Sequence, residues 1–323
     1  MKIKINFTDF WGGFDPWDNF ITNTLKEQYE VLIVPEPDFL FYSCFGMRHM
    51  TYDCVRIFYT GENLHPDFNL CDYAIGFQNG SWGDRYLRYP LYQLVAPELE
   101  MARMKHTFEF TEALLHRKFC NFIYSNGSAD PSRNMFFYLL SQYKKVDSGG
   151  GVLNNLGYRV EHKLTFQQQY KFSIAFENAS APGYTTEKIV QAFAAGTIPI
   201  YWGNPDIGQE FNTRSFVNCH DYESFEDVVR AVQEIDENDD KYLKMMKEPI
   251  EKGTVWKIEQ AEDAMKNFLW KIVRQSKTEA YRRTRAATML NYERKHRTIQ
   301  RFMDNVVISL IVKAYHWRKR IIK

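Results

Sequence analysis

Charged side chains suited to acid–base or phosphate chemistry occur in three separate parts of the sequence. Glu62, Arg133 and the neighbours Glu187 and Lys188 each come shortly after an apolar run typical of a β-strand. A carboxylate at the end of a strand can act as a general base when its surroundings keep its pKa suitable. Arginine and lysine near helix starts suit a phosphate, because the free backbone N–H groups there also attract anions. These residue types predict a ligand with a diphosphate group beside a base.

The segment 176–207 carries the densest set of such residues. Glu177 and Asn178 follow an apolar run and are expected to emerge where that strand ends. Lys188 occupies the first turn of the next predicted helix, although the positive end of the helix dipole favours Asp or Glu there. A negatively charged ligand would explain this lysine. The alternative is a solvated lysine on a helix that only packs.

The other candidates also have structural alternatives. Thr185 or Thr186 can cap the same helix, and Glu187 is a first-turn residue that any helix favours. Arg133 can equally form a surface ion pair, and Glu62 can equally be a turn glutamate. Their combination favours a site in which cations from two loops neutralise a departing diphosphate without a metal ion.

The pattern of apolar runs predicts the scaffold for these residues. Strands are expected at 2–7, 30–37, 38–44, 55–63, 72–77, 119–126, 171–178 and 198–202, and helices at 17–29, 97–118, 131–143, 187–195, 223–235 and 258–275. Alternating strands and helices favour parallel sheets with crossover helices, so two similar α/β halves are expected. Ligands of such halves bind at the carboxyl ends of the strands. Pro199 cannot donate a ladder hydrogen bond, which predicts an edge strand or a bulge there.

The composition indicates a globular protein of the cytoplasm. The chain has 323 residues, of which 45% are hydrophobic, enough to bury a core in each half. Five scattered cysteines without a C-x-x-C pair fit a reducing compartment. No apolar run near the start suits a signal peptide, and the longest aliphatic run, at 306–312, is far too short for a membrane span.

The C-terminal segment differs electrostatically from the rest of the chain. Residues 274–323 contain 14 Lys and Arg against 3 Asp and Glu, a net charge of +11, which leaves −10 for the other 273 residues. Apolar residues from Ile299 to Ala314 recur at helical spacing. The surrounding basic residues are Arg282, Arg283, Arg285, Arg294, Lys295, Arg297 and those of 317–323.

A basic amphipathic helix is typical of binding to an anionic membrane surface, so a membrane is the expected partner of this segment. The alternatives are pairing with its twin in a homodimer, or packing on the acidic body of the same chain. Nucleic acid is not an expected partner.

Several motifs of the chain resemble those of glycosyltransferase family 10, the α-1,3/4-fucosyltransferases. That family carries Phe-Glu-Asn-Ser, Gly-Tyr-Val-Thr-Glu-Lys and Ile-Pro-Ile-Tyr-Trp-Gly in series, and this chain has FENAS, GYTTEK and IPIYWG. The resemblance extends to RIFYTGENLHPDFNLCDYAIGF, RYLRYP, SRN, GGG, LGY and SFVN. It covers 1–275 and is strongest to the bacterial branch, such as the Helicobacter enzymes.

The resemblance implies an α/β fold of the GT-B type, in which two Rossmann-like domains face a central cleft. The corresponding domains are 1–116 for the acceptor, 117–275 for GDP-fucose and 276–323 as the basic amphipathic tail. It implies an inverting α-1,3-fucosyltransferase that moves L-fucose from GDP-fucose to the GlcNAc of N-acetyllactosamine-type glycans. The expected products are Lewis antigen-like glycans, such as those on lipopolysaccharide. The enzyme is expected to lie on the inner face of the cell membrane as a peripheral protein, held there by 277–323.

The functional positions of the family match particular residues of this chain. Glu62 matches the catalytic base, and Arg133 and Lys188 match the cations that hold the diphosphate. The further donor-binding positions match Asn178, Tyr184, Thr185 and Glu187. Glu187 is also expected near the fucose or ribose, where it would assist the cationic transition state. The resemblance implies no metal site and no obligatory cofactor, with a divalent cation at most stimulating the reaction.

Two departures from the family motifs alter local donor contacts without removing a charge. Asn178-Ala179-Ser180 replaces the usual Asn-Ser, and Thr185 replaces the usual Val. The alternative functions are α-1,4 linkage, transfer from another nucleotide sugar on the same fold, and a membrane-bound glycan-binding module without turnover.

Aromatic loop-like segments of the first half are the candidates for the acceptor site. Trp11 and Trp82 are the residues expected to stack on a sugar. They and Trp17 can equally be core residues.

Overall fold

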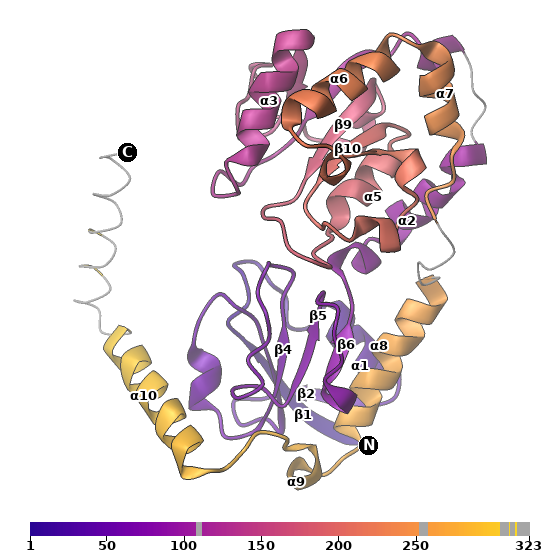
Figure 1. Cartoon of the computed structure of the whole chain (residues 1–323). Helices are drawn as coiled ribbons and strands as arrows, with labels where there is room; N and C mark the ends of the chain where they lie inside the picture. Colours follow the sequence, from indigo (N-terminus) through magenta and orange to yellow (C-terminus); the bar gives the residue numbers. More distant parts are fainter. Residues whose placement is uncertain (108–111, 252–257, 304–309, 311–313, 315–323) are drawn as a thin grey trace. The chain divides into compact units, whose positions relative to one another are not determined.

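The computed structural model describes residues 1–107, 112–251, 258–303, 310 and 314, and it contains two α/β units (Figure 1). Of these described residues, those in 1–76, 81–87 and from Asp263 onward form the first unit, and those in 77–80 and 88–262 form the second. Each unit has its own parallel sheet, which confirms the expected α/β class.

The sheet of the first unit has the strand order β2-β1-β3-β4-β5-β6. Its elements are β1 (Lys2–Thr8), α1 (Phe20–Lys26), β2 (Glu30–Ile33), β3 (Phe39–Tyr42), β4 (Val55–Tyr59), β5 (Tyr73–Gly76) and β6 (Tyr86–Arg88). β3, β4 and β5 are buried along their whole length, which explains their continuous apolar runs. β3 and β4 end earlier than predicted, because Ser43 and Thr60 leave the sheet and yet stay buried.

The sheet of the second unit has the strand order β11-β10-β9-β7-β8. Its strands are β7 (Lys118–Phe122), β8 (Val146–Ser148), β9 (Tyr170–Phe176), β10 (Ile198–Trp202) and β11 (Val217–Asn218). Its helices are α2 (Ala96–Arg103), α3 (Ser132–Tyr143), α4 (Lys163–Gln167), α5 (Glu187–Ala194), α6 (Phe225–Asp236) and α7 (Asp239–Lys247). Short 3₁₀ helices lie at Arg48–Thr51, Gly83–Arg85, Leu91–Leu94, Met104–Thr107, Glu112–Leu114, Ile207–Gln209, Thr213–Ser215 and Cys219–Asp221.

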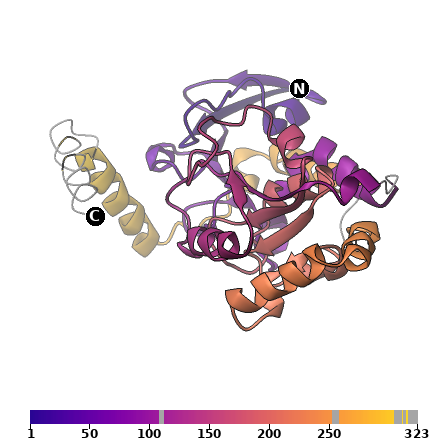
Figure 2. The same cartoon turned by 90° about the horizontal axis from the view of Figure 1, so that it is seen from above.

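Helices cover both faces of this second sheet. Ile174 and Phe176 of β9 belong to the apolar core under α3 and α6, which lie beside each other (Figures 1 and 2). Ala175 points to the opposite face, because side chains alternate along a strand, and it packs with α5 and α2. The sheet thereby positions the residues that follow β7 and β9.

Pro199 does not lie in an edge strand, contrary to the prediction. β10 pairs with β9 over its whole length, while β11 begins only opposite Ile200. No part of β11 reaches Pro199, so the missing N–H removes no hydrogen bond to that neighbour.

The first unit also contains α8 (Ile258–Val273), α9 (Lys277–Ala280) and α10 (Ala287–Met303). Trp270 of α8 donates its indole N–H to the Thr24 carbonyl oxygen (3.2 Å), and Leu269 is completely buried. Residues 263–275 therefore lie with the first sheet, not with the second domain as expected.

The other expected boundary, after 116, also differs from the structure. The predicted helix 97–118 contains only α2 as an α-helix, and α2 shares a buried core with α5. The residues from Arg88 onward consequently belong to the second unit.

A buried ion network attaches the C-terminal segment to the first sheet. Asp72 is completely buried and accepts hydrogen bonds from the backbone N–H groups of Arg282 and Arg283 (2.8 and 2.9 Å). The Arg283 guanidinium pairs with the same carboxylate (3.0 Å), and Glu293 bridges Arg283 and Arg56. The expectation that Arg283 belongs to a basic surface is wrong, because its charge is neutralised inside the unit.

Replacing Asp72 by asparagine is expected to lower the free energy of unfolding by about 3–5 kcal/mol, because Arg283 and Arg56 stay buried with Glu293 as their one shared carboxylate. Denaturant unfolding of the full chain measures this loss. The matched control is Asp84→Asn, which removes the outlying ion pair with Arg282 and should cost less than about 1 kcal/mol. Equal losses in both variants would contradict an attachment through Asp72.

The burial of Lys105 predicts that the free energy of unfolding depends on pH. It is completely buried, with its ammonium 5.0 Å from the centroid of the Phe193 ring and 3.4 Å from the Ser215 carbonyl oxygen. Burial lowers the pKa of Lys105 from 10.5 to about 7. Between these values the unfolded chain carries a proton that the folded chain has lost, so this lysine makes the free energy of unfolding rise with pH.

Lys105→Met is expected to remove this dependence and to stabilise the protein most at and below about pH 7, where the penalty is fully present. Unfolding of the wild type and the variant near pH 7 and near pH 9 measures it, with Lys244→Met on the exposed side of α7 as control. A stability difference that does not shrink as pH rises would exclude Lys105 as the cause.

Candidate active site

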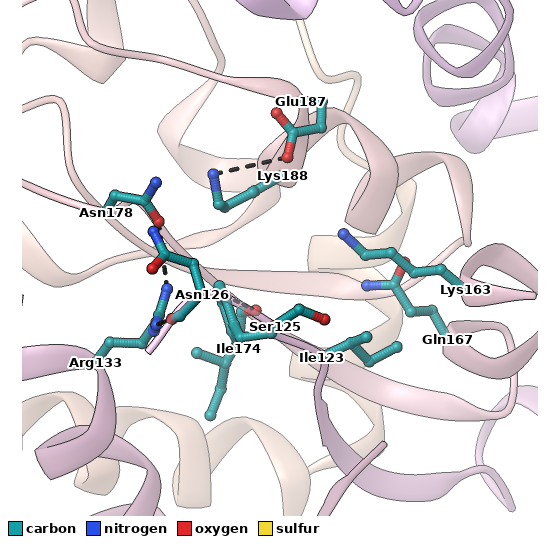
Figure 3. A pocket seen from close by; sticks show the side chains of 11 residues that line it. Ile123, Ser125, Asn126, Arg133, Lys163, Gln167, Ile174, Asn178, Glu187 and Lys188 are labelled. Atoms are coloured by element: carbon teal, nitrogen blue, oxygen red, sulfur yellow. Dashed lines mark hydrogen bonds and ion pairs between the residues drawn. The ribbon is translucent and has the colours of Figure 1, made fainter. Parts of the chain in front are cut away.

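A pocket of the second unit lies at the ends of β7 and β9 and at the start of α5 (Figure 3). Its lining consists of Ile123, Tyr124, Ser125, Asn126, Arg133, Lys163, Gln167, Ile174, Asn178, Glu187 and Lys188. Four residues predicted from the sequence, Arg133, Asn178, Glu187 and Lys188, are thus brought together from three segments.

Arg133 comes from the first turn of α3 and is held by three contacts. Its guanidinium lies 4.2 Å from the centroid of the Tyr124 ring and donates to the Asn126 carbonyl oxygen and to Asn178 Oδ1 (3.3 Å). The residue is 1% exposed, and its Nε has no partner among the described residues. The alternative of a surface ion pair is therefore wrong, and Arg133 is a buried cation in the pocket wall.

The Tyr124 ring is fixed by hydrogen bonds to β9, and the Tyr124 backbone lies against the glycine-rich segment 149–151. Its hydroxyl donates to the Ile174 carbonyl oxygen (2.9 Å) and accepts from the Phe176 N–H (2.7 Å). A Cβ at Gly150 would lie only 2.2 Å from the Tyr124 carbonyl oxygen, so only glycine permits this approach. Gly150 thereby helps to position the platform of Arg133.

Lys188 extends from the first turn of α5 between two carboxylates. Its ammonium lies 2.9 Å from Glu177 Oε2 and 3.6 Å from Glu187 Oε1, and it donates to Thr186 Oγ1 (2.8 Å). Burial by itself lowers the pKa of Lys188, but the two carboxylates outweigh that effect and hold the pKa above its ordinary value. Lys188 is therefore a positive charge of the pocket at neutral pH.

Glu177 does not emerge at the pocket edge, contrary to the expectation. It is completely buried, and its carboxylate accepts hydrogen bonds from the N–H (2.7 Å) and the hydroxyl (2.6 Å) of Thr186. Burial raises the pKa of Glu177, and Lys188 opposes that shift. A carboxylate inside the protein thus already compensates the lysine at the helix start, so a ligand is not needed to explain it.

Glu187 lines the pocket with a side chain that is 28% exposed. Burial raises the pKa of this carboxyl, but Lys188 and Lys163 outweigh it and hold the pKa below its ordinary value. The ionised carboxylate can accept hydrogen bonds from a sugar or stabilise a nearby positive charge.

Tyr184 and Thr185 are buried outside the lining of this pocket. The Tyr184 ring packs on Phe77 (4.9 Å between centroids), and Thr185 Oγ1 accepts a hydrogen bond from Asn204 Nδ2 (3.1 Å). These contacts hold the turn before α5, and direct contact with a donor remains a prediction for both residues.

The predicted base lies in the first unit. Glu62 is half-buried in the loop after β4, where its backbone N–H donates to Thr60 Oγ1 (3.0 Å). Tyr59, at the end of β4, contacts Phe10 in the loop after β1 (6.3 Å between centroids). Because β1 and β4 are parallel strands of one sheet, both loops lie at its carboxyl edge.

The candidate acceptor residues are exposed in the first unit, Trp11 in the loop after β1 and Trp82 in the segment after β5. Trp11 is 46% and Trp82 39% exposed, and Trp17 is also exposed, so the alternative that they are core residues is wrong. Trp11 contacts Phe10, and Trp82 contacts Phe68 of the loop that carries Glu62. Exposed aromatic rings thus lie in loops at the same edge of the sheet as the loop that carries Glu62.

Lys163, Gln167 and Asn126 line the pocket although they were not predicted to. The two α4 residues are four positions apart, which places them on one helix face. This spacing was the available signal, but a helix of five residues is too short for a clear apolar period.

Two Rossmann-like units, one with a cationic pocket at its strand ends, agree with the GT-B class. The model of the α-(1,3)-fucosyltransferase FucT N-terminal domain matches residues 5–95, and that of the glycosyltransferase family 10 (fucosyltransferase) C-terminal domain matches residues 115–289. The chain therefore belongs to glycosyltransferase family 10.

Among its relatives is the α-(1,3)-fucosyltransferase FucT of Helicobacter pylori, 34% identical over 286 residues, which cover 76% of this chain and 60% of that protein. The chain thus spans less than two thirds of this relative. A crystal structure of an α1,3-fucosyltransferase with GDP-fucose is 31% identical with a TM-score of 0.69, and covers 83% of this chain and 90% of that one. A second, with GDP, is also 31% identical, with a TM-score of 0.72 and coverages of 85% and 91%. These matches confirm the predicted GT-B fold.

Neither a membrane-spanning helix nor a metal-binding cluster is found in the described ranges. No helix there is long and apolar enough to cross a membrane. Within the same ranges, no three His, Cys, Asp or Glu residues are grouped so that they could hold a metal ion.

Proposed function

We propose that this chain is an inverting α-1,3-fucosyltransferase that transfers L-fucose from GDP-fucose to the GlcNAc of N-acetyllactosamine-type glycans. The observation that carries the proposal is the pocket in which Arg133, Lys188 and Asn178 meet at the start of α5. Two cations at the start of a helix suit the diphosphate of a nucleotide sugar, because the positive end of the helix dipole also attracts anions. The α1,3-fucosyltransferase structures with GDP-fucose and GDP support this donor.

The proposed reaction is a single displacement at the anomeric carbon of fucose. The O3 hydroxyl of GlcNAc attacks that carbon, the bond from it to the phosphate oxygen breaks, and GDP leaves with the electron pair. Glu62 accepts the hydroxyl proton as general base. Arg133 and Lys188 stabilise the negative charge that develops on GDP, and Glu187 stabilises the positive charge on the sugar ring.

The reaction is proposed to need no obligatory cofactor, because two protein cations already face the position of the leaving group. Transfer should continue in the presence of EDTA, with a divalent cation at most increasing the rate. Complete loss in EDTA and recovery with added Mg²⁺ or Mn²⁺ would contradict this part of the proposal.

The acceptor is proposed to bind over the aromatic loops of the first unit. Trp11 and Trp82 offer exposed ring faces on which a sugar can stack. Leucine at either position is expected to raise the KM for the glycan and to leave GDP affinity unchanged.

The deciding experiment measures GDP release from GDP-fucose with two isomeric acceptors. N-acetyllactosamine leaves O3 of GlcNAc free, whereas lacto-N-biose leaves O4 free, so the pair separates α-1,3 from α-1,4 transfer. We expect release with N-acetyllactosamine and an α-linked product by NMR. Binding of GDP without release from either acceptor would favour a glycan-binding module, and turnover of another nucleotide sugar would favour a different donor.

We further propose that α10 binds the surface of an anionic membrane from the cytoplasmic side. Leu290, Ile299 and Phe302 are exposed apolar residues of α10, and Arg294 and Lys295 are exposed cations on the same helix. Most of the predicted apolar stripe beyond 303 lies outside the described residues.

Co-sedimentation with vesicles containing phosphatidylserine tests this surface in the full chain. Arg294→Ser with Lys295→Ser should weaken binding about tenfold or more, since each cation contributes about 1 kcal/mol. Deletion from 277 is unsuitable, because Arg283 and Glu293 stabilise the first unit. Binding that is unchanged by the double variant, or a concentration-dependent dimer lost with it, would contradict the proposal.

A further inference from the structure

Among the described residues, a second pocket shares none of its lining with the pocket that contains Arg133 and Lys188. Six of its lining residues carry a hydrogen-bonding side chain: Asn79, Arg88, Tyr92, Gln93, Gln209 and Glu210. All six belong to the second unit. The proposed transfer reaction uses none of them, so this pocket suits a ligand other than the donor.

The two charges of this second pocket compensate each other. Arg88 donates to Glu210 Oε1 (2.7 Å), and the same oxygen accepts a hydrogen bond from Asn204 Nδ2 (3.0 Å). The other lining side chains carry no charge at neutral pH. Because Glu210 repels an anion and Arg88 repels a cation at close range, the pocket favours a neutral ligand.

Two buried polar atoms of the second pocket have no hydrogen-bond partner within the part of the chain that the structure describes. They are Oε1 of Gln93, a residue that is 6% exposed, and Nε of Arg88. One atom accepts and the other donates, so a hydroxyl group, which does both, suits the pair. The terminal torsion of glutamine is soft and lets the amide turn toward such a group. Since most buried polar groups in folded proteins are hydrogen-bonded, these two atoms favour a hydroxylic ligand.

The second pocket has room for more than a bridging water. Its volume is about 180 Å³, whereas one water needs roughly 10–15 Å³ of such space. A ligand with several polar groups therefore fits.

We propose that the second pocket binds a neutral, hydroxyl-rich ligand of about the size of one sugar residue. The amides of Asn79, Gln93 and Gln209 are planar groups that can donate to one hydroxyl and accept from its neighbour. Tyr92 adds a hydroxyl and an aromatic ring to the lining. The ligand is either a free sugar or one sugar unit of a glycan, and the recognition chemistry is the same for both. This site goes beyond the proposed function, because it lies outside the donor pocket and the aromatic loops of the first unit.

NMR titration of the full chain tests the site without requiring turnover. The probes are the methyl glycosides of galactose, fucose and N-acetylglucosamine, with saturating GDP present to occupy the first pocket. We expect at least one probe to bind, and Gln93→Leu to weaken it about tenfold, as for one lost buried hydrogen bond. Gln168→Leu changes an exposed glutamine of the same unit and should leave this affinity unchanged.

A second variant keeps the site testable if Gln93→Leu is unstable. Arg88→Lys retains the charge opposite Glu210 but has no Nε–H, so it should weaken the same probe. Thermal unfolding checks both variants. Gln93→Leu should not lower the midpoint, because it removes a buried amide oxygen that lacks a partner.

Initial rates separate the two sources of the ligand. For a sugar unit of the acceptor glycan, Gln93→Leu should raise the KM for a chain of two N-acetyllactosamine units and leave the KM for a single unit unchanged. For a free sugar, both KM values should stay the same while the affinity for the methyl glycoside falls. Either pattern supports the site.

Three outcomes would overturn the inference. They are no binding of any probe, equal losses in Gln93→Leu and Gln168→Leu, or a probe whose affinity falls only in Trp11→Leu, which would place it on the first unit. A chain that binds a probe through Gln93 but never transfers fucose would refute the proposed function and leave this site standing.

Discussion

Glu62→Gln is expected to lower the rate of fucose transfer about 10²- to 10⁴-fold while leaving the affinity for GDP unchanged. Glutamine keeps the size and most hydrogen bonds of the side chain but cannot accept the proton of the attacking hydroxyl. Glu62 lies in the first unit, whereas the cationic pocket belongs to the second, so loss of its charge should not disturb the diphosphate site. Initial rates at saturating GDP-fucose and acceptor measure the loss of transfer, and calorimetry measures the affinity for GDP.

The matched control is Glu36→Gln, an exposed glutamate in a loop of the same unit, which should transfer fucose at the wild-type rate. Near-normal turnover of Glu62→Gln with both substrates saturating would show that another group acts as the base. Loss of GDP affinity in the same variant would instead indicate a structural role for the loop after β4.

Lys188→Ala is expected to have the second largest effect, because it removes a cation from the leaving group and also leaves Glu177 unpaired. Removal of one group aimed at developing charge costs about 10²- to 10³-fold in rate. Breaking a buried ion pair from one side costs about 3–5 kcal/mol of stability. Transfer, GDP affinity and the midpoint of thermal unfolding should all fall together.

A second substitution separates these two effects. Lys188→Ala with Glu177→Gln removes both charges, while the amide oxygen of the introduced glutamine can still accept one of the two hydrogen bonds from Thr186. Stability should recover in part, because no uncompensated charge stays buried, whereas transfer and GDP affinity should stay low. Recovery of transfer along with stability would mean that Lys188 serves only to neutralise Glu177.

Most helices and strands could be predicted from the sequence, because the local pattern of apolar residues differs between the two. β10 occupies the predicted residues, and α5 differs from its prediction by one residue at its end. The prediction for α1 extended too far, because Asn19 accepts a hydrogen bond from the Thr22 N–H and starts the helix at Phe20. α7 was not predicted from the sequence. Its acidic first turn and basic last turn resemble a charged loop when the core that it packs against is not known.

Contacts between distant segments caused the remaining errors. Glu177 was expected at the pocket edge because strand ends generally open there, yet Thr186 and Lys188 enclose it. The basic residues next to Arg283 in sequence predict a basic surface there. In the structure, Arg283 instead forms a buried ion pair with Asp72, which is far away in the chain.

The amino-acid sequence by itself determined the family, the α/β class and the residues Arg133, Asn178, Glu187 and Lys188 of the pocket. These depend on local motifs, because a strand end or a helix start positions the residues next to it. Only the tertiary structure decided which carboxylate neutralises Lys188, and that Lys163 and Gln167 enter the same pocket. The physical reason is that burial and ion pairing depend on segments far apart in sequence, whose meeting no local pattern records.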